Sequence, residues 1–143
     1  MSQAKSFMIK LNHATQQDDS KIFIVLAFCS DMEGKISYSD FEKVQLKVGE
    51  ITSVEEHPNA SKLLVLKVNL GEGEDRTIVA GLRAHYSKED LEGKKAIFVA
   101  NLEPVVLRGV KSDGMILAAV SEDEKEVVFL TPEREVKEGS KIR

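Results

Sequence analysis

The sequence predicts an all-β fold: a five-stranded β-barrel with a short helix at its start and a second small helix between strands 3 and 4. Two observations predict it. Short apolar runs, several with a period-two alternation, recur along the chain and are separated by turns rich in Gly, Pro and Asp, which is typical of β-strands. A helix-start signal lies between the third and fourth runs, and this order of elements within about 100 residues is what a small barrel requires.

The barrel is expected to open with a short helix followed by a long strand. Ser39 and Glu42 fit the capping box, in which the Ser hydroxyl and the Glu carboxylate satisfy unpaired amides at a helix start. Apolar residues then alternate with polar ones across residues 44–54, the period of a half-buried strand. The alternation changes phase after Gly49, which predicts a bulge or a sharp bend at that position.

The later elements follow from the same kinds of signal. His57-Pro58-Asn59-Ala60 predicts a turn, and residues 71–75 have the composition of a hairpin loop. Ser87-Lys88-Glu89-Asp90 resembles a second capped helix start, with Gly93 at the end of that helix. The other strands are predicted at residues 63–70, 76–80, 96–100, 115–119 and 127–130, which gives a count of five or six short strands, five of them for the barrel.

This order of elements fits an oligonucleotide/oligosaccharide-binding barrel (OB-fold), in which closing the sheet removes its edges and the loops at one rim stay free to bind. We assign residues 37–143 to the OB-fold and residues 1–36 to an N-terminal extension of uncertain structure. The apolar run at 22–29 could form a buried strand. Met32 could equally be the true start of the chain, and the sequence leaves both interpretations open.

Composition excludes several classes of protein. The single Cys29 cannot form an intramolecular disulfide, and no CxxC or His-x-x-x-His pattern indicates a metal site, so no cofactor is expected. The apolar run at 22–29 is far shorter than the roughly 18 residues that indicate a membrane span. We therefore expect a cytoplasmic protein with no membrane partner.

Catalysis is not expected. An active site needs convergent groups, such as a nucleophile beside a base, and His13, His57 and His85 each lie in a different neighbourhood. His57 precedes a proline in a predicted turn, where we expect a hydrogen-bonding or partly packed side chain. Cys29 lies in an apolar run without a nearby basic residue, which favours a buried structural thiol over a nucleophile.

The distribution of charge favours the middle of the chain as a surface for a polyanion. The net charge of −4 opposes nucleic-acid binding, because Lys and Arg drive that binding by releasing counterions from phosphate. Residues 76–111, however, carry seven Lys and Arg against four Asp and Glu. The acidic residues gather at 122–126 and 133–138, where a solvated surface is the simpler interpretation.

Residues 101–119, NLEPVVLRGVKSDGMILAA, join two strand-like runs through a connection that is both charged and rich in glycine. Three further motifs precede it in the chain: FEKVxLxVGxI at 41–51, HPNAxKL at 57–63 and RTIVxG at 76–81. Together these stretches closely resemble the EMAP-II-like tRNA-binding domain. This family includes free-standing tRNA-binding proteins and the C-terminal module of many methionyl-tRNA synthetases, and the resemblance covers residues 38–143.

The resemblance implies an OB-fold without catalytic activity that binds tRNA by its folded shape. By this resemblance Lys62 and Arg108 would contact phosphate, Arg108 through a planar bidentate pair. Asn101 and Ser112 would donate or accept hydrogen bonds with the RNA backbone or bases, and Met115 would contact an exposed base or ribose. The alternative is structural: Asn101 would cap a turn, and Met115 would begin a core strand.

The resemblance also implies protein partners. Free-standing members are usually homodimers, and the helix near Phe41 and the tail at 131–143 are the predicted interface. An aminoacyl-tRNA synthetase, methionyl-tRNA synthetase first, is the expected second partner. Three residues depart from the family pattern: Val106 stands where Lys is frequent, Ser61 where Asp is frequent, and Asp113 where Gln or Glu is common. The lost cation at Val106, in a chain of net charge −4, predicts weak to moderate affinity for tRNA.

Two other functions stay open. Peptide-binding chaperones of the secretion-associated type share the same barrel and dimer, although they tend to lack the turn motif found here at 57–63. A scaffold subunit that joins a synthetase complex through protein contacts, with a weakened RNA site, is the third interpretation.

Overall fold

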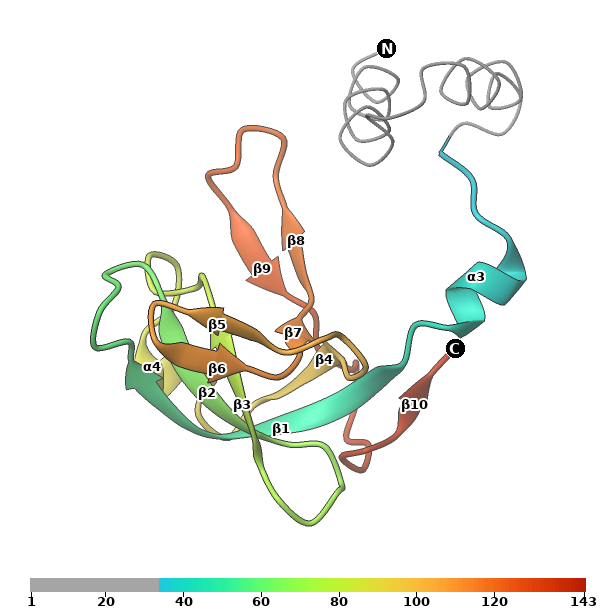
Figure 1. Ribbon diagram of the computed structural model, residues 1–143, viewed down its shortest axis with the longest axis horizontal. Coiled ribbons are helices and arrows are strands. Elements are labelled where there is room, and N and C mark those ends of the chain that lie inside the picture. Colours follow the sequence, from blue (N-terminus) through green and yellow to red (C-terminus); the bar gives the residue numbers. More distant parts are fainter. Residues whose placement is uncertain (1–33) are drawn as a thin grey trace. The chain divides into compact units, whose positions relative to one another are not determined.

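The computed structural model describes residues 34–143, which Figure 1 shows as coloured ribbon. The chain divides into one unit that ends at Lys43 and a second, compact unit of Val44–Arg143 that contains every strand of the described part. The predicted boundary after residue 36 stays a prediction. The apolar run at 22–29, with Cys29, and the alternative start at Met32 lie outside the described residues.

Helix α3 (Tyr38–Glu42) forms close to where the sequence predicts a helix, but a different serine caps it. The Oγ atom of Ser37 accepts the N–H of Asp40 at 3.1 Å. The predicted capping box that starts at Ser39 is therefore wrong, because Ser39 already lies inside the first turn. Ser37 and Asp40 are three residues apart, which is the spacing that an N-cap hydrogen bond requires.

Five strands form the barrel, and they follow the sheet order β3-β2-β1-β4-β7 with antiparallel pairing throughout. The long β1 lies at the centre because its first half pairs with β4 and its second half with β2. Helix α4 (Lys88–Leu91) lies between β3 and β4. The predicted OB-fold is confirmed by this five-stranded antiparallel barrel with two short helices. The strands are β1 (Leu46–Glu56), β2 (Leu64–Asn69), β3 (Arg76–Ala80), β4 (Lys95–Val99) and β7 (Met115–Ile116).

At Gly49, strand β1 keeps a regular register with β4, where Gly49 pairs with Ala96, so the bulge predicted at this position does not lie there. A Cβ atom at Gly49 would lie 2.7–2.8 Å from three core side chains, so only glycine lets them pack against the strand. The register with β2 shifts slightly later, between Ile51 and Ser53. An irregularity of this kind increases the local twist, which helps a sheet to close.

The barrel interior is filled by apolar side chains that the alternating pattern predicts. Helix α4 contributes Leu91 to this core, and its start is held by the reciprocal hydrogen bonds of Ser87 and Asp90 that the sequence indicates. Burial of these side chains is the main stabilising term of the fold. The largest fully buried ones are Val48, Ile51, Val54, Leu64, Leu66, Val68, Leu70, Ile78, Leu91 and Phe98.

Two hairpins and a short terminal strand lie outside the main barrel path. The β5–β6 hairpin (Val105–Leu107 and Val110–Ser112) and the β8–β9 hairpin (Ala118–Val120 and Val127–Phe129) are separate two-stranded sheets, and β10 (Lys141–Ile142) pairs with the start of β1 (Figure 1). The single strand predicted at 115–119 is wrong. It is divided at Leu117, because β7 pairs with β4 whereas β8 turns away to pair with β9.

Candidate functional site

The connection between β4 and β7 carries the β5–β6 hairpin, whose turn consists of Arg108 and Gly109. Both residues have positive φ, 51° and 91°, as a two-residue type I′ turn requires. Arginine rarely adopts this conformation, because its Cβ atom approaches the following carbonyl oxygen. The turn therefore places an exposed guanidinium group at the tip of the hairpin and does so with a strained backbone.

The turn after β1 holds the tip of this hairpin. The Nδ1 atom of His57 accepts the N–H of Asn59 at 3.0 Å, and its Nε2 atom donates to the carbonyl oxygen of Leu107 at 2.8 Å. The Nδ2 atom of Asn59 also donates to the carbonyl oxygen of Arg108 at 3.3 Å. Lys62, exposed, lies in the same connection, so the two cations predicted from sequence lie on segments that are fastened together.

Ser112 lies in the interior, only 3% exposed. Its Oγ atom accepts the N–H of Val79 at 2.9 Å and donates to the carbonyl oxygen of Gly114 at 3.3 Å. The hydroxyl thus ties β6 to β3 at the base of the hairpin. The RNA contact predicted for Ser112 stays a prediction, and the sequence reasoning missed this buried position.

Asn101 and Met115 lie next to the end of β4. The Oδ1 atom of Asn101 accepts the N–H of Gln45 at 2.8 Å, and Met115 pairs with Val99 in the sheet. The Met115 side chain is 45% exposed, so it begins a barrel strand and also presents its thioether to solvent. The structural and the binding interpretations of Met115 are compatible.

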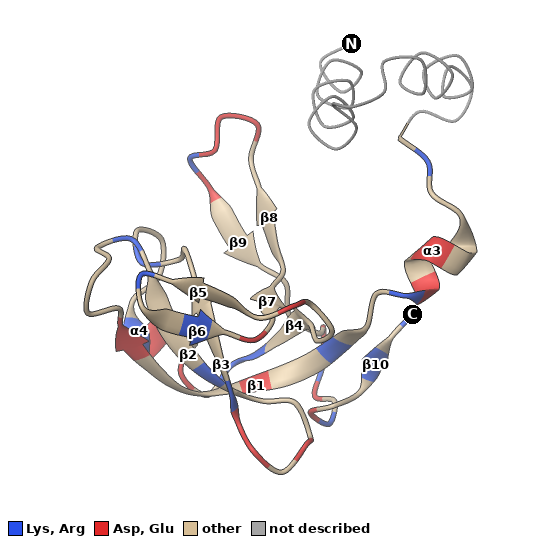
Figure 2. Ribbon diagram, in the orientation of Figure 1, with Lys and Arg blue, Asp and Glu red and all other residues tan. Residues whose placement is uncertain are grey.

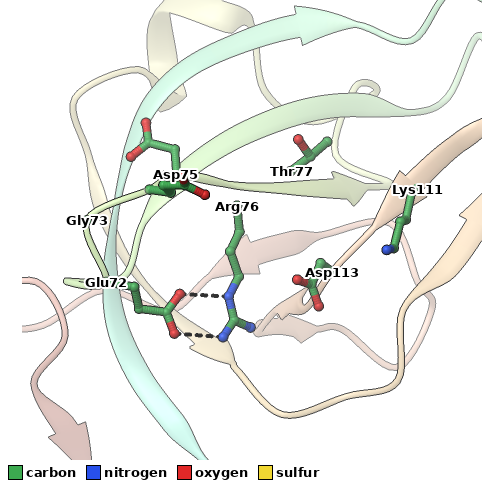
Figure 3. Close-up of a pocket in the computed structure, with 8 residues that line it drawn as sticks. Glu72, Gly73, Asp75, Arg76, Thr77, Lys111 and Asp113 are labelled. Atoms are coloured by element: carbon green, nitrogen blue, oxygen red, sulfur yellow. Dashed lines mark hydrogen bonds and ion pairs between the residues drawn. The ribbon is translucent and has the colours of Figure 1, made fainter.

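Beside the hairpin, the guanidinium group of Arg76 hydrogen-bonds to other groups of the protein, and Figure 3 shows its pair with Glu72. Its Nε and Nη2 atoms donate to the two carboxylate oxygens of Glu72 at 2.8 and 2.7 Å, and Nη1 donates to the carbonyl oxygen of Ala100. The hydrogen bonds from Arg76 lower the pKa of Glu72 below its ordinary value. Although Arg76 counts toward the basic stretch at 76–111, its charge is largely compensated. The surrounding pocket is lined by Glu72, Gly73, Glu74, Asp75, Arg76, Thr77, Lys111 and Asp113.

Besides Arg108 at its tip, the β5–β6 hairpin carries one exposed cation on its strands, Lys111. Val106 is 64% exposed, and the exposed Lys111 lies directly opposite it in the register. The strongest acidic cluster, residues 122–126, lies at the tip of the separate β8–β9 hairpin (Figure 2). Positive charge at the β5–β6 tip and negative charge at the β8–β9 tip are therefore carried by different projections of the fold.

Apolar side chains are exposed in the segments predicted as a dimer interface and, separately, on the β8–β9 hairpin. In α3, Tyr38 and Phe41 are both exposed, with ring centroids 6.5 Å apart. On one face of the β8–β9 hairpin and just beyond it, Val128 and Leu130 are 52% and 41% exposed. In the tail, Val136 is exposed too.

Within residues 34–143, no cluster of three or more His, Cys, Asp or Glu could hold a metal ion. In the same range, no helix combines the length and the apolar character that crossing a membrane requires.

Comparison with known proteins points to a tRNA-binding domain by family model and to methionine–tRNA ligases by sequence identity. Residues 46–141 match the family model described as "Putative tRNA binding domain". The methionine–tRNA ligase of Pyrococcus furiosus is 51% identical over 108 residues, and that of Nanoarchaeum equitans is 47% identical over 110 residues. These matches cover 76% and 77% of this chain but only 14% of each ligase, so the chain spans a small fraction of the length of these relatives.

Two solved structures match the chain over nearly their whole length. A MetRS-related protein from Pyrococcus horikoshii is 40% identical with a TM-score of 0.71, and the match covers 76% of this chain and 97% of that one. The chaperone CsaA of Bacillus anthracis is 31% identical with a TM-score of 0.69, covering 77% of this chain and 100% of that one.

Proposed function

We propose, on the premise that this chain belongs to the tRNA-binding domain family, that it binds tRNA by the folded shape of the molecule and catalyses no reaction. The observation that carries the proposal is the strained Arg108-Gly109 turn, which places an exposed guanidinium beside the connection that carries Lys62. Strained backbone at an exposed tip is typical of functional sites. Shape recognition suits RNA, because the deep major groove of its helices hides the base edges.

In this proposal Arg108 and Lys62 bind phosphate groups. The guanidinium of Arg108 offers paired donors that match two phosphate oxygens, whereas the ammonium of Lys62 acts as a point charge. Lys111, opposite Val106 on the hairpin, adds a third positive charge to the site. Few phosphate contacts predict weak to moderate affinity and a shallow dependence on salt.

The neutral residues of the site contribute shape. Met115 packs its exposed thioether against a base or ribose, and Asn101 hydrogen-bonds the RNA backbone or a base beside it. The hydroxyl of Ser112 is buried and holds the base of the hairpin by accepting the N–H of Val79. A hydrogen bond from Ser112 to the RNA would require this contact with Val79 to break.

Homodimerisation and delivery of tRNA to a methionyl-tRNA synthetase in the cytoplasm complete the proposal. The similarity to methionine–tRNA ligases supports the synthetase partner. The exposed Tyr38 and Phe41 in α3 support a protein interface, and so, separately, do the exposed Val128 and Leu130 at the end of the β8–β9 hairpin, because exposed apolar patches are typical of protein contacts.

Peptide binding is the second candidate function, because the chaperone CsaA matches over its whole length. The turn motif at 57–63 and the basic tip of the hairpin favour RNA instead. Binding of unfolded polypeptide that neither excess tRNA nor an Arg108→Ala substitution reduces would favour the chaperone.

The test is a salt titration of binding to fluorescent tRNA, with a duplex RNA of equal length as competitor. We expect wild type to prefer tRNA, and Arg108→Ala and Lys62→Ala each to lose affinity and to flatten the slope of log affinity against log salt by about one unit. Lys125→Ala is the matched control, since it removes the same charge from the acidic β8–β9 tip. Equal binding of tRNA and duplex by wild type would contradict the proposal.

A further inference from the structure

The described part of the chain has two polar residues with buried side chains, His57 and Ser112, each 3% exposed. A buried polar group destabilises a fold unless its hydrogen bonds are satisfied, so their partners explain their presence. Both tie down the β5–β6 hairpin: His57 hydrogen-bonds to the carbonyl oxygen of Leu107 near the tip, and Ser112, itself in β6, accepts the N–H of Val79 in β3 at the base. The buried hydrogen-bonding side chains of the barrel therefore converge on the projection that carries Arg108.

The hairpin needs such ties, because its strands form a separate two-stranded sheet. A two-stranded ribbon is marginally stable in water by itself. Its base is held twice, by the Ser112 hydroxyl and by the N–H of Asp113, which donates to the carbonyl oxygen of Thr77 at 2.8 Å. Its tip is held by side chains of the 57–63 turn.

The contacts at the tip reach the two carbonyl groups that flank the strained residue. His57 donates to the carbonyl oxygen of Leu107, and Asn59 donates to that of Arg108 itself. Because Nδ1 of His57 accepts an N–H, the neutral ring with its proton on Nε2 satisfies both of its contacts at once. The imidazole of His57 thus stabilises the 57–63 turn and also holds the backbone of the β5–β6 hairpin at Leu107.

We propose that His57 is a positioning residue for RNA binding: it holds the Arg108-Gly109 turn in its positive-φ conformation, so that the guanidinium is in place before RNA arrives. The inference rests on the proposed function, since it assigns how the RNA site is prepared. Ordering a flexible arm at the moment of binding reduces affinity, and a preformed arm avoids that loss. His57 itself is buried and has no free polar atom for RNA.

Removing His57 should therefore weaken binding without removing a phosphate contact. His57→Asn is the informative change, because the Asn side-chain oxygen can still accept the N–H of Asn59 but the side chain is too short to reach Leu107. We expect about tenfold weaker tRNA binding, from the ordering cost of the released tip, with the salt slope unchanged. His57→Gln, whose amide nitrogen can reach Leu107, should recover part of the loss. His85→Asn, at an exposed histidine, is the matched control.

A double-mutant cycle decides whether His57 acts through Arg108. Affinity is measured for wild type, His57→Asn, Arg108→Ala and the double variant, at a temperature where denaturant titration shows all four to be folded. If the inference is right, His57→Asn costs little in the Arg108→Ala background, because the effect is strongly non-additive. Hydrogen exchange at the Gly109 and Val110 amides should also become faster in His57→Asn than in the control.

The outcomes separate the two claims. If wild type binds tRNA and His57→Asn loses the same factor with or without Arg108, the inference is overturned and the proposed function stands. An unchanged affinity of His57→Asn overturns it in the same way. If wild type does not bind tRNA even at low salt, the proposed function fails and the inference fails with it.

Discussion

Replacement of Arg108 by Asn should make the protein more stable and a weaker RNA binder at the same time. The turn needs positive φ at both of its residues, and the angles are 51° at Arg108 and 91° at Gly109. Asn-Gly is the preferred sequence for this type I′ turn, because the short Asn side chain tolerates the left-handed region. The native Arg therefore carries a conformational cost that a binding role explains.

The magnitude follows from that cost. The left-handed conformation is unfavourable by about 1–2 kcal/mol for an ordinary L-residue. We expect Asn, whose short polar side chain tolerates this region, to relieve about half of that cost. We expect Arg108→Asn to raise the free energy of unfolding by about 0.5–1 kcal/mol, or the Tm by about 2–8 °C for a barrel of about 100 residues. Loss of the guanidinium should flatten the salt slope of tRNA binding by about one unit.

Urea denaturation and the salt titration measure the two effects on the same preparations. Arg108→Lys is the control, because it keeps both the charge and the backbone cost, so its stability should equal that of wild type. Equal or lower stability of Arg108→Asn would refute the reasoning, since the positive φ at this position would then carry no cost that Asn can relieve.

Two further predictions concern the barrel. Gly49→Ala should lower the free energy of unfolding by about 1–3 kcal/mol, because its Cβ would lie 2.7–2.8 Å from core side chains; Gly81→Ala, whose nearest contact would be at 4.0 Å, should be almost neutral in the same urea titration. Glu72→Gln should cost about 0.5–1 kcal/mol at pH 7, through loss of the bidentate pair with Arg76. Because the pKa of Glu72 is lowered in the folded protein, the stabilisation is fully present above the pKa of the unfolded carboxyl and disappears as the pH falls through the folded pKa. The free energies of unfolding of wild type and Glu72→Gln should therefore converge in acid. A difference between them that stays constant with pH would contradict the assignment.

The strands could be predicted from sequence because burial of one face imposes a local pattern. Residues 63–70 and 76–80 alternate or run apolar as barrel strands should, and β2 and β3 lie there. Residues 115–119 look like one strand because each residue suits a strand, and only the competing partners β4 and β9 divide it. The start of α3 was missed by two residues because Ser37 and Ser39 are equally good caps by type.

The candidate site was predicted less completely, for a physical reason. Lys62 and Arg108 are exposed, as charged residues in turn motifs should be. The partners of His57 and Ser112, however, lie about fifty and thirty-three positions away in sequence, at Leu107 and Val79, and no local pattern encodes such pairings. The His-Pro turn was the available signal, and it predicted a hydrogen-bonded histidine without naming the partner.

The pairing of β10 with the beginning of β1 places the two ends of the barrel next to each other, with Leu46 opposite Ile142. A domain whose ends meet can be attached at either end of a longer polypeptide, or inserted into a surface loop, with little distortion of the host. The same geometry makes the fold a natural subject for circular permutation, with a short linker joining the old ends. In the two methionine–tRNA ligases the matching segment makes up 14% of the chain, as expected for a barrel that can be fused to other domains as a unit.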